Sequence, residues 1–293
     1  MACLSQKFAG ELLGQDTSYG PLRHEVKRDA MSGVAGTPGL AELVRKRDPD
    51  RFLTALFAPA AKREALFVLY AFNDELARAT EIVSQPILAL IRLQWWREVV
   101  EGTAKRHEIA TPLTQAIDAG VLRRDDLLAL IEAREAEADP AFADVGLWRA
   151  WLMAGAGELA VAAGHAVGED DAEALRPYGA AYGAAGVLRR ARSLAHAGRV
   201  RLPNDVLAAH GLVPEAVTAE PDTPKLAGVL HDLAAEARQW LPPRPAAVKR
   251  AAVAAALPAV LARRDLRRPD APAVPRGVAD RIAVMRAAVA GRV

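Results

Sequence analysis

The chain of 293 residues is long enough to bury one large hydrophobic core or two smaller ones. Its formal charge of +2 is close to balance, and no aromatic residues alternate with basic ones, which argues against a nucleic-acid partner. Cys3 is the single cysteine, which excludes an intrachain disulfide bond and a cysteine-rich zinc site.

Membrane and export signals are weak along the chain. The N-terminal stretch lacks the apolar segment of a signal peptide, because charged residues such as Lys7 and Glu11 interrupt it. Two apolar tracts run over residues 148–167 and 251–262. Charged side chains interrupt the first tract, and the second has only about half of the ~20 residues that a membrane helix needs. We therefore predict a soluble or peripheral protein.

The composition favours helix over sheet, because alanine is abundant and aromatic residues make up only 5% of the chain. Residues 1–36 show no helical period and are predicted to form a flexible N-terminal extension, followed by one helical domain over 37–293. Thr37-Pro38 and Asp48-Pro49 each combine an N-cap residue with proline at the first helical position. Further helices are predicted over 59–84, 86–101, 112–119, 124–138, 144–167, 170–196, 203–210, 223–241, 244–265 and 276–290.

The helix predicted over 59–84 carries a polar stripe. Asp74, Ala77, Arg78 and Glu81 lie three or four residues apart and therefore share one face of the helix. Apolar residues, including Phe72, supply most of the opposite face. A stripe of this kind is either a solvated, salt-bridged surface or part of a binding site, and the spacing alone does not decide between them.

The helix predicted over 170–196 carries Gly179, Gly183 and Gly186 at helical spacing. Each glycine costs about 1 kcal/mol relative to alanine in a helix, so a row of them indicates close approach of another helix or of a ligand. Arg189 and Arg190 follow within one turn, where guanidinium groups could bind phosphate oxygens directly.

Several elements of the sequence resemble squalene and phytoene synthases. They are Phe52 to Pro59, Arg63, Tyr70-Ala71-Phe72, Leu93-Gln94-Trp95-Trp96-Arg97, Leu188-Arg189, Gly198-Arg199-Val200 and Leu202-Pro203. Their order also agrees with that family, over roughly residues 45 to 265. The resemblance implies a single-domain, all-α isoprenoid synthase fold with a central cavity.

Active members of that family carry two D-x-x-x-D-type motifs on facing helices, and these motifs hold the magnesium ions that bind a prenyl diphosphate. Magnesium requires oxygen ligands in near-octahedral geometry, and it neutralises the charge of the leaving group. In this chain the first motif falls on Ala77 and Glu81, so half of it is lost. The second falls on Arg190 and Leu194, so all of it is lost. The resemblance therefore implies no metal site, unless Asp74 joins Glu81 around one ion.

Other positions that the resemblance assigns to the cavity are also altered. A polar pair expected one turn before the second motif falls on Gly183 and Gly186, and an expected tyrosine falls on Trp151. We also expect Arg97 to pair with a carboxylate such as Glu81. No residue is assigned a catalytic role. The candidate cavity and ligand-binding residues are Tyr70, Asp74, Arg78, Glu81, Trp96, Arg97, Trp151, Gly183, Gly186, Arg189 and Arg190.

A closer resemblance is to one subgroup of the family, carried by Ala71-Phe72-Asn73, Glu75-Leu76-Ala77, Val83-Ser84, Arg92, Gln94, Trp96 and residues 132–135. That subgroup also lacks the aspartate motifs and includes a mitochondrial assembly factor for respiratory complex I. The resemblance implies a catalytically degenerate protein without a cofactor that supports assembly of NADH:quinone oxidoreductase. Its expected partners are complex I subunits or other assembly factors, in the cytoplasm or at the inner face of the cytoplasmic membrane.

Two alternatives remain open at the level of sequence. One is an active, magnesium-dependent head-to-head prenyltransferase that condenses prenyl diphosphates to squalene- or phytoene-like products. The other is a protein that binds a prenyl compound or another lipid and has no assembly role.

Overall fold

A computed structural model describes residues 38–81, 86–135, 137 and 142–293. The predicted N-terminal extension over 1–36 and the proposed cap at Thr37 lie outside the described residues. In the described part of the unit that begins at Gly36, the regular elements are all helices, and the isolated antiparallel bridge between Ala247 and Arg292 is the only β-type pairing.

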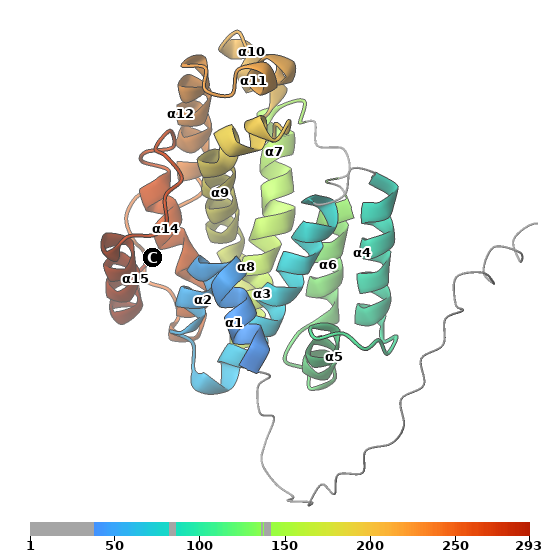
Figure 1. The fold of residues 1–293 in the computed structure, drawn as a ribbon. Helices are drawn as coiled ribbons and strands as arrows, with labels where there is room; N and C mark the ends of the chain where they lie inside the picture. The colour runs from blue at the N-terminus through green and yellow to red at the C-terminus, as the bar shows by residue number, and fades with distance from the viewer. Residues whose placement is uncertain (1–37, 82–85, 136, 138–141) are drawn as a thin grey trace, which may run out of the picture. The chain divides into compact units, whose positions relative to one another are not determined.

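The helices follow one another in short succession (Figure 1). In chain order they are α1 (Pro38–Arg47), α2 (Pro49–Ala55), α3 (Ala60–Glu81), α4 (Pro86–Glu101), α5 (Ala110–Asp118), α6 (Arg124–Glu135), α7 (Val145–Leu152), the π-helix η2 (Met153–Gly157), α8 (Glu158–Val167), the 3₁₀-helix η3 (Ala172–Leu175), α9 (Arg176–His196), α10 (Asn204–Ala209), α11 (Pro214–Ala219), α12 (Lys225–Arg238), the 3₁₀-helix η4 (Arg250–Ala252), α13 (Val253–Ala256), α14 (Pro258–Asp265) and α15 (Val278–Ala290).

Local signals set most of the helix boundaries. The carboxylate of Asp48 accepts a hydrogen bond of 2.9 Å from the backbone N–H of Arg51, as expected of an N-cap ahead of Pro49. Gly102 follows α4 with φ of +113°, a conformation that glycine adopts without strain. These boundaries agree with the sequence prediction because each depends on residues within one turn of the helix end.

Three segments differ from the sequence prediction. The helix expected over 144–167 contains the π-helix η2 in its middle, and the linker expected over 211–222 contains α11. The helix expected over 244–265 begins only at η4, after three prolines between residues 242 and 245. Proline removes a backbone donor and disfavours helical geometry in the residue before it, which explains the late start.

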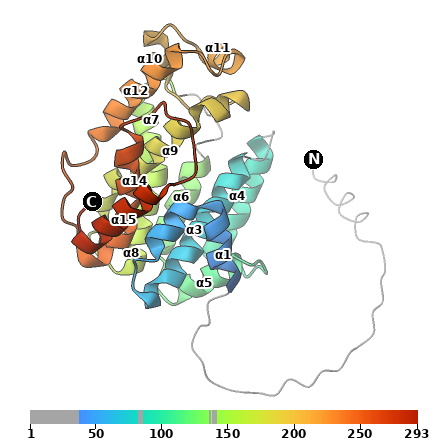
Figure 2. The same cartoon turned by 60° about the vertical axis from the view of Figure 1, so that its left-hand side comes forward.

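The core forms around α3, α8 and α9. The apolar face of α3 is fully buried, with Leu66, Leu69, Phe72 and Leu76 at 0% exposure. Helix α3 contacts α4, α5, α6 and α8, while α9 contacts η2, α12 and α14, and Figure 2 shows the same neighbours from a second direction. Helix α8 contacts both α3 and α9 and so joins the two parts of the core.

Residues 145–167 run as one continuous helical stretch through α7, η2 and α8. By length and composition alone this stretch could cross a membrane, although 61% of its apolar window is buried inside the protein. The sequence prediction held this tract too interrupted by charge to span a membrane; its length and composition pass that test, and its charged side chains are paired within the protein. Glu158, for example, forms an ion pair of 2.7 Å with Arg176. The burial is typical of a core helix.

Candidate functional site

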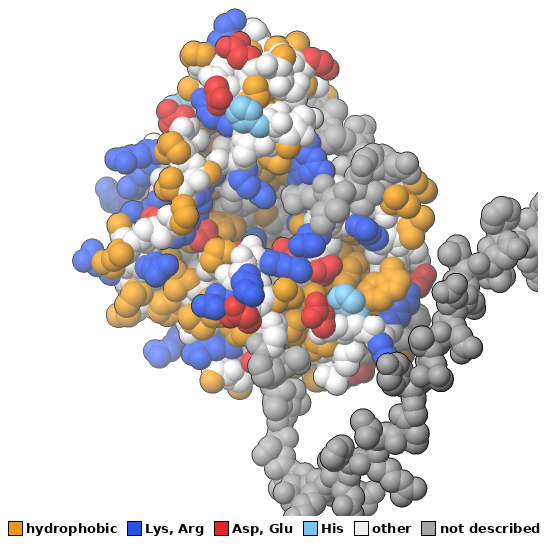
Figure 3. All heavy atoms as spheres, viewed as in Figure 1, with side chains coloured by type: hydrophobic (Ala, Val, Ile, Leu, Met, Phe, Trp, Pro, Cys, Tyr) orange, Lys and Arg blue, Asp and Glu red, His pale blue; other side chains and the backbone are white. Residues whose placement is uncertain are grey.

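A cavity of about 450 Å³ opens between α2, α3, η2, α9 and the segment that follows α14. Its volume lies within the range of about 300–1,000 Å³ that is usual for small-molecule sites. Figure 3 shows the surrounding face, where basic and acidic side chains are interspersed around a central hollow. Arginines outnumber carboxylates in the described lining by seven to five, which favours an anionic occupant.

Most of the residues predicted for the cavity meet there. They come from α3, the α7–η2 stretch and α9, and they are Asp74, Ala77, Trp151, Gly183, Gly186, Arg189 and Arg190. Tyr70 lines a much smaller adjacent pocket of about 10 Å³, together with Arg51 and Tyr182. The two helices that carry the altered motifs therefore face one cavity.

Other predicted residues lie elsewhere. Trp96 is 4% exposed and packs in the core, where its ring lies 5.4 Å from that of Phe72. Arg97 pairs with a carboxylate, as expected, and the partner is Glu135, to which it donates two hydrogen bonds of 2.9 and 3.0 Å. Neither residue is part of the described cavity lining. The cause is that α4 packs against α3 and α6 and not against α9.

Two further positions also fall outside the described lining. Arg78 is exposed on α3, and Leu194 is half-buried near the end of α9. For Glu81 the structure describes only the backbone, so its side chain lies outside the described residues.

The π-helix η2 forms part of the cavity wall through Gly155 and Ala156. A π-helix leaves backbone groups out of the regular α pattern, and such segments are frequent at functional sites. Arg176 compensates here, because its Nη1 donates a hydrogen bond of 3.1 Å to the carbonyl oxygen of Met153. Gly179 lies directly against this segment, where an added Cβ would be only 2.3 Å from the carbonyl oxygen of Ala156. The glycine row thus serves close packing at Gly179, whereas Gly186 has open space beside it.

Asp74, from the polar face of α3, is held by an arginine. Nη1 of Arg47 lies 2.7 Å from Asp74 Oδ2 and 2.6 Å from Glu75 Oε1. Burial raises the pKa of Asp74 above its usual range, although the hydrogen bond from Arg47 opposes this rise. Arg47 therefore stabilises the charged form of the Asp74 carboxylate.

The remaining wall carboxylates have arginine partners too. Glu137 accepts a hydrogen bond of 2.7 Å from Arg134 through Oε1, and Nη1 of Arg201 lies 3.7 Å from Glu137 Oε2. Trp151 donates its indole N–H to the same carboxylate at 3.0 Å. Asp48 accepts from Arg51 at 2.8 Å. These ion pairs already occupy the oxygens that a metal would need.

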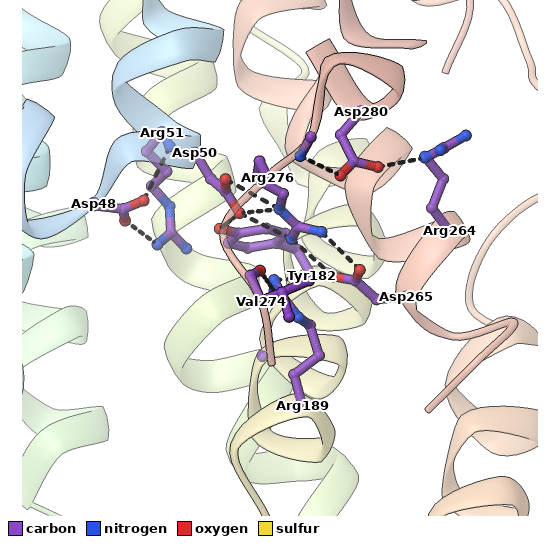
Figure 4. Close-up of polar contacts among 12 residues, drawn as sticks. Asp48, Asp50, Arg51, Tyr182, Arg189, Arg264, Asp265, Val274, Arg276 and Asp280 are labelled. Carbon is purple, nitrogen blue, oxygen red and sulfur yellow. Dashed lines mark hydrogen bonds and ion pairs between the residues drawn. The ribbon is translucent and has the colours of Figure 1, made fainter. Parts of the chain in front are cut away.

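The segment after α14 is fastened over the cavity by one arginine (Figure 4). Arg276 donates to Asp265 at 2.7 and 2.8 Å and to Asp50 at 2.9 and 3.1 Å. Burial of this guanidinium opposes its charge, but its hydrogen bonds to Asp265 and Asp50 outweigh burial and raise the pKa. Arg189 adds a hydrogen bond of 2.8 Å to the carbonyl oxygen of Val274. We call residues 269–276 the strap, since this segment runs from α14 to α15 and its residues 273–276 line the cavity.

Arg51 and Tyr182 line the cavity, and Tyr70 lies behind them in the small adjacent pocket. The Arg51 guanidinium carbon lies 4.8 Å from the ring centre of Tyr182 and 5.8 Å from that of Tyr70. The Tyr182 hydroxyl donates to Asp50 at 3.1 Å, and burial raises the pKa of both tyrosines. Both therefore stay neutral at physiological pH.

The described side chains do not fit magnesium. Among them no group of three or more His, Cys, Asp or Glu residues is placed to hold a metal ion. Arg190, at a position where active relatives are expected to carry aspartate, lines the cavity, and its fixed positive charge repels a cation. The arrangement is suited to holding an anion.

Replacing Arg47 with methionine is expected to raise the pKa of Asp74 further, because the hydrogen bond that opposes burial is removed. At neutral pH the free energy of unfolding should fall by about 1.5–3 kcal/mol, the usual contribution of a hydrogen bond to a charged group. With its folded-state pKa above the unfolded value, Asp74 binds a proton more tightly when folded. The loss should therefore shrink as the pH falls through the folded-state pKa.

Urea unfolding of this variant and the wild type across that pH range checks the expectation. The control is Arg45→Gln, which breaks only an exposed pair with Glu42 and should leave the unfolding curve unchanged. A loss that stays constant with pH would contradict the role given to Asp74.

Most of the arginines in the wall were not predicted from the sequence. Arg47, Arg134 and Arg276 lie on three separate elements, and only Arg134 falls within a segment that carries the family resemblance, residues 132–135. Arg201 lies in the segment after the second motif helix, between residues that carry the family resemblance, but no role was assigned to it. The sequence contains more arginine than lysine, which is a signal for anion binding. The order of residues along the chain does not reveal which arginines meet at the cavity.

Comparisons with known proteins agree with this geometry. A family model described as squalene/phytoene synthase matches residues 44–273. The human protein named "NADH dehydrogenase (ubiquinone) complex I, assembly factor 6" is 27% identical over 208 residues, which cover 68% of this chain and 62% of the human protein. The bovine protein of that name is 28% identical over 218 residues, with 71% and 66% covered. The chain thus spans slightly less than two thirds of these relatives.

Solved structures share the fold. A crystal structure of a dehydrosqualene synthase in complex with ligand has a TM-score of 0.70 at 12% identity, covering 86% of this chain and 94% of that one. A squalene synthase from Alicyclobacillus acidocaldarius has a TM-score of 0.59 at 15% identity, covering 86% and 93%. The predicted all-α isoprenoid synthase fold is confirmed. Because the family match extends over most of the chain, this protein belongs to the squalene/phytoene synthase family.

Proposed function

We propose that this protein is a non-catalytic member of its family that supports assembly of respiratory complex I. Its partners would be complex I subunits or other assembly factors, in the cytoplasm or at the inner face of the cytoplasmic membrane. The names of the human and bovine relatives support this role, at 27% and 28% identity. The cavity would hold a prenyl compound or another lipid with an anionic head group and would require no cofactor.

The observation that carries the proposal is the chemistry of the cavity wall. Helices α3 and α9 present Ala77 and Arg190 where an active enzyme requires carboxylates, and the described wall carboxylates are paired with arginines. Arginine can bind a diphosphate through charge-assisted hydrogen bonds. Such binding stabilises the ground state as well as the leaving group, so it accelerates ionisation little. The site is therefore suited to binding without turnover.

A deletion strain tests the assembly role. Loss of the gene is expected to reduce the amount of intact complex I and its NADH:quinone oxidoreductase activity, while other respiratory enzymes stay at normal levels. Native gel electrophoresis with an in-gel NADH dehydrogenase stain measures both. Wild-type protein and the Glu81→Gln variant should restore the complex equally, because the role requires no metal ligand. Normal complex I in the deletion strain would reject the proposal.

The enzymatic alternative has its own assay. Purified protein is incubated with farnesyl or geranylgeranyl diphosphate and magnesium, and released diphosphate is measured. We expect no release above the rate without protein. Release that disappears in Glu81→Gln would establish catalysis. Native mass spectrometry of the purified protein tests the ligand separately, since a co-purified isoprenoid combined with normal complex I in the deletion strain would favour a binding protein with no assembly role.

A further inference from the structure

Helix α15 exposes a narrow row of apolar side chains. Val278, Ile282, Met285 and Val289 are 72%, 42%, 53% and 90% exposed. Steps of four, three and four residues separate them, which is the spacing of the apolar seam along which two helices pair. We call these four side chains the α15 seam. They point away from the buried core, so the folded chain leaves the seam without a partner among the described residues.

The opposite side of α15 is fixed to the protein. Val284 is fully buried. Asp280 accepts a hydrogen bond of 2.7 Å from Arg264 and one of 3.2 Å from the backbone N–H of Gly277. After the helix, Val293 exchanges two backbone hydrogen bonds with Ala246, of 2.8 and 2.9 Å. Figures 1 and 2 show α15 at the margin of the described unit, beside α14. The seam is thus presented by a helix that is already ordered, which lowers the entropy lost on docking.

Positive charge flanks the seam on both sides. Arg281 and Arg286 are exposed and form no ion pair among the described residues. Relative to the seam they occupy the two flanking positions that select a partner by charge in paired helices. The single acidic residue of α15, Asp280, is already engaged by Arg264. An incoming helix would therefore meet a positive rim on either side of an apolar centre.

The width of the α15 seam and the positive charge beside it distinguish between possible binding partners. A second copy of α15 would bring arginine against arginine, which is unfavourable. A lipid surface is usually bound by a broad apolar face with large side chains such as Trp, Phe and Leu, whereas this seam is one side chain wide and has none of these. We propose that α15 docks an amphipathic helix of another protein that carries Asp or Glu on both sides of its own apolar seam. This surface lies on α15, outside the cavity lining, and does not depend on the proposed function.

The test uses the full chain and two fluorescent helical peptides with leucine at the seam positions. One peptide carries glutamate at the flanking positions and the other carries lysine. Fluorescence anisotropy should show about tenfold tighter binding of the glutamate peptide, since several exposed charge pairs of a few tenths of a kcal/mol add up. Arg281→Glu combined with Arg286→Glu should reverse the preference.

Matched substitutions locate the binding. Ile282→Asp with Val289→Asp should abolish it without changing the melting temperature, because both side chains are exposed. Ile87→Asp with Ile91→Asp changes two side chains of similar exposure on α4, 59% and 58%, and should leave binding intact. No binding of the glutamate peptide, or equal binding of both peptides, would overturn the proposal. Self-association or flotation with vesicles containing phosphatidylglycerol, lost in Ile282→Asp with Val289→Asp, would instead assign the seam to a second copy or to lipid.

Discussion

Replacing Gly179 with alanine should lower the free energy of unfolding by about 3 kcal/mol or more, the upper end of the usual cost of overpacking. The added Cβ would lie 2.3 Å from the carbonyl oxygen of Ala156 and 2.6 Å from the Cβ of Ala160. The first of these is a backbone atom, so α9 and η2 would have to move apart. Urea unfolding, followed by circular dichroism, measures the loss.

Gly186→Ala is the matched control in the same helix. A Cβ added at this position would meet no heavy atom within 4 Å, so only the helix propensity changes. Alanine should then raise the free energy of unfolding by about 0.5–1 kcal/mol. Equal effects at Gly179 and Gly186 would show that the glycine row is not there for close packing against η2.

Replacing Arg276 with methionine should lower the free energy of unfolding by about 3–5 kcal/mol, the cost of breaking a buried ion pair by removing one partner. Asp50 and Asp265 would both lose their main partner, and each side chain is only 13% exposed. The strap would lose its main attachment as well. Urea unfolding measures the stability, and hydrogen exchange of residues 269–277 measures the release of the strap.

Two further variants test whether the loss of stability comes from the buried ion pairs of Arg276. Arg264→Gln removes an ion pair with Asp280 in which the arginine side chain is 42% exposed, and it should cost less than about 1 kcal/mol. Adding Asp50→Asn and Asp265→Asn to the Arg276→Met variant removes the uncompensated charges and should restore part of the stability. If the triple variant is no more stable than the single one, the loss does not come from isolated carboxylates.

The fold was largely accessible from sequence because its helix boundaries are local. Asp48 and Gly102 act within one turn of the helices that they limit. The π-helix was not accessible, since its carbonyl at Met153 is satisfied by Arg176, 23 residues away in sequence. The glycine in contact with it, Gly179, was recognised as a packing signal, but its neighbour could not be identified from spacing.

The candidate site was likewise only partly predictable from the sequence. The family resemblance identified the motif positions Ala77 and Arg190, and both line the cavity. The ion pairs of the wall were missed because they join distant elements: Arg47 meets Asp74 from another helix, and Arg276 meets Asp50 across 226 residues. Contacts of this range depend on the finished fold.

The pairing of Arg276 with Asp50 also affects how the protein is made. Asp50 is synthesised 226 residues before Arg276. During most of translation its carboxylate therefore lacks this ion-pair partner. Contacts between such distant positions close late and slowly. We therefore expect the cavity between the helices to close only after the segment that carries Arg276 has been synthesised.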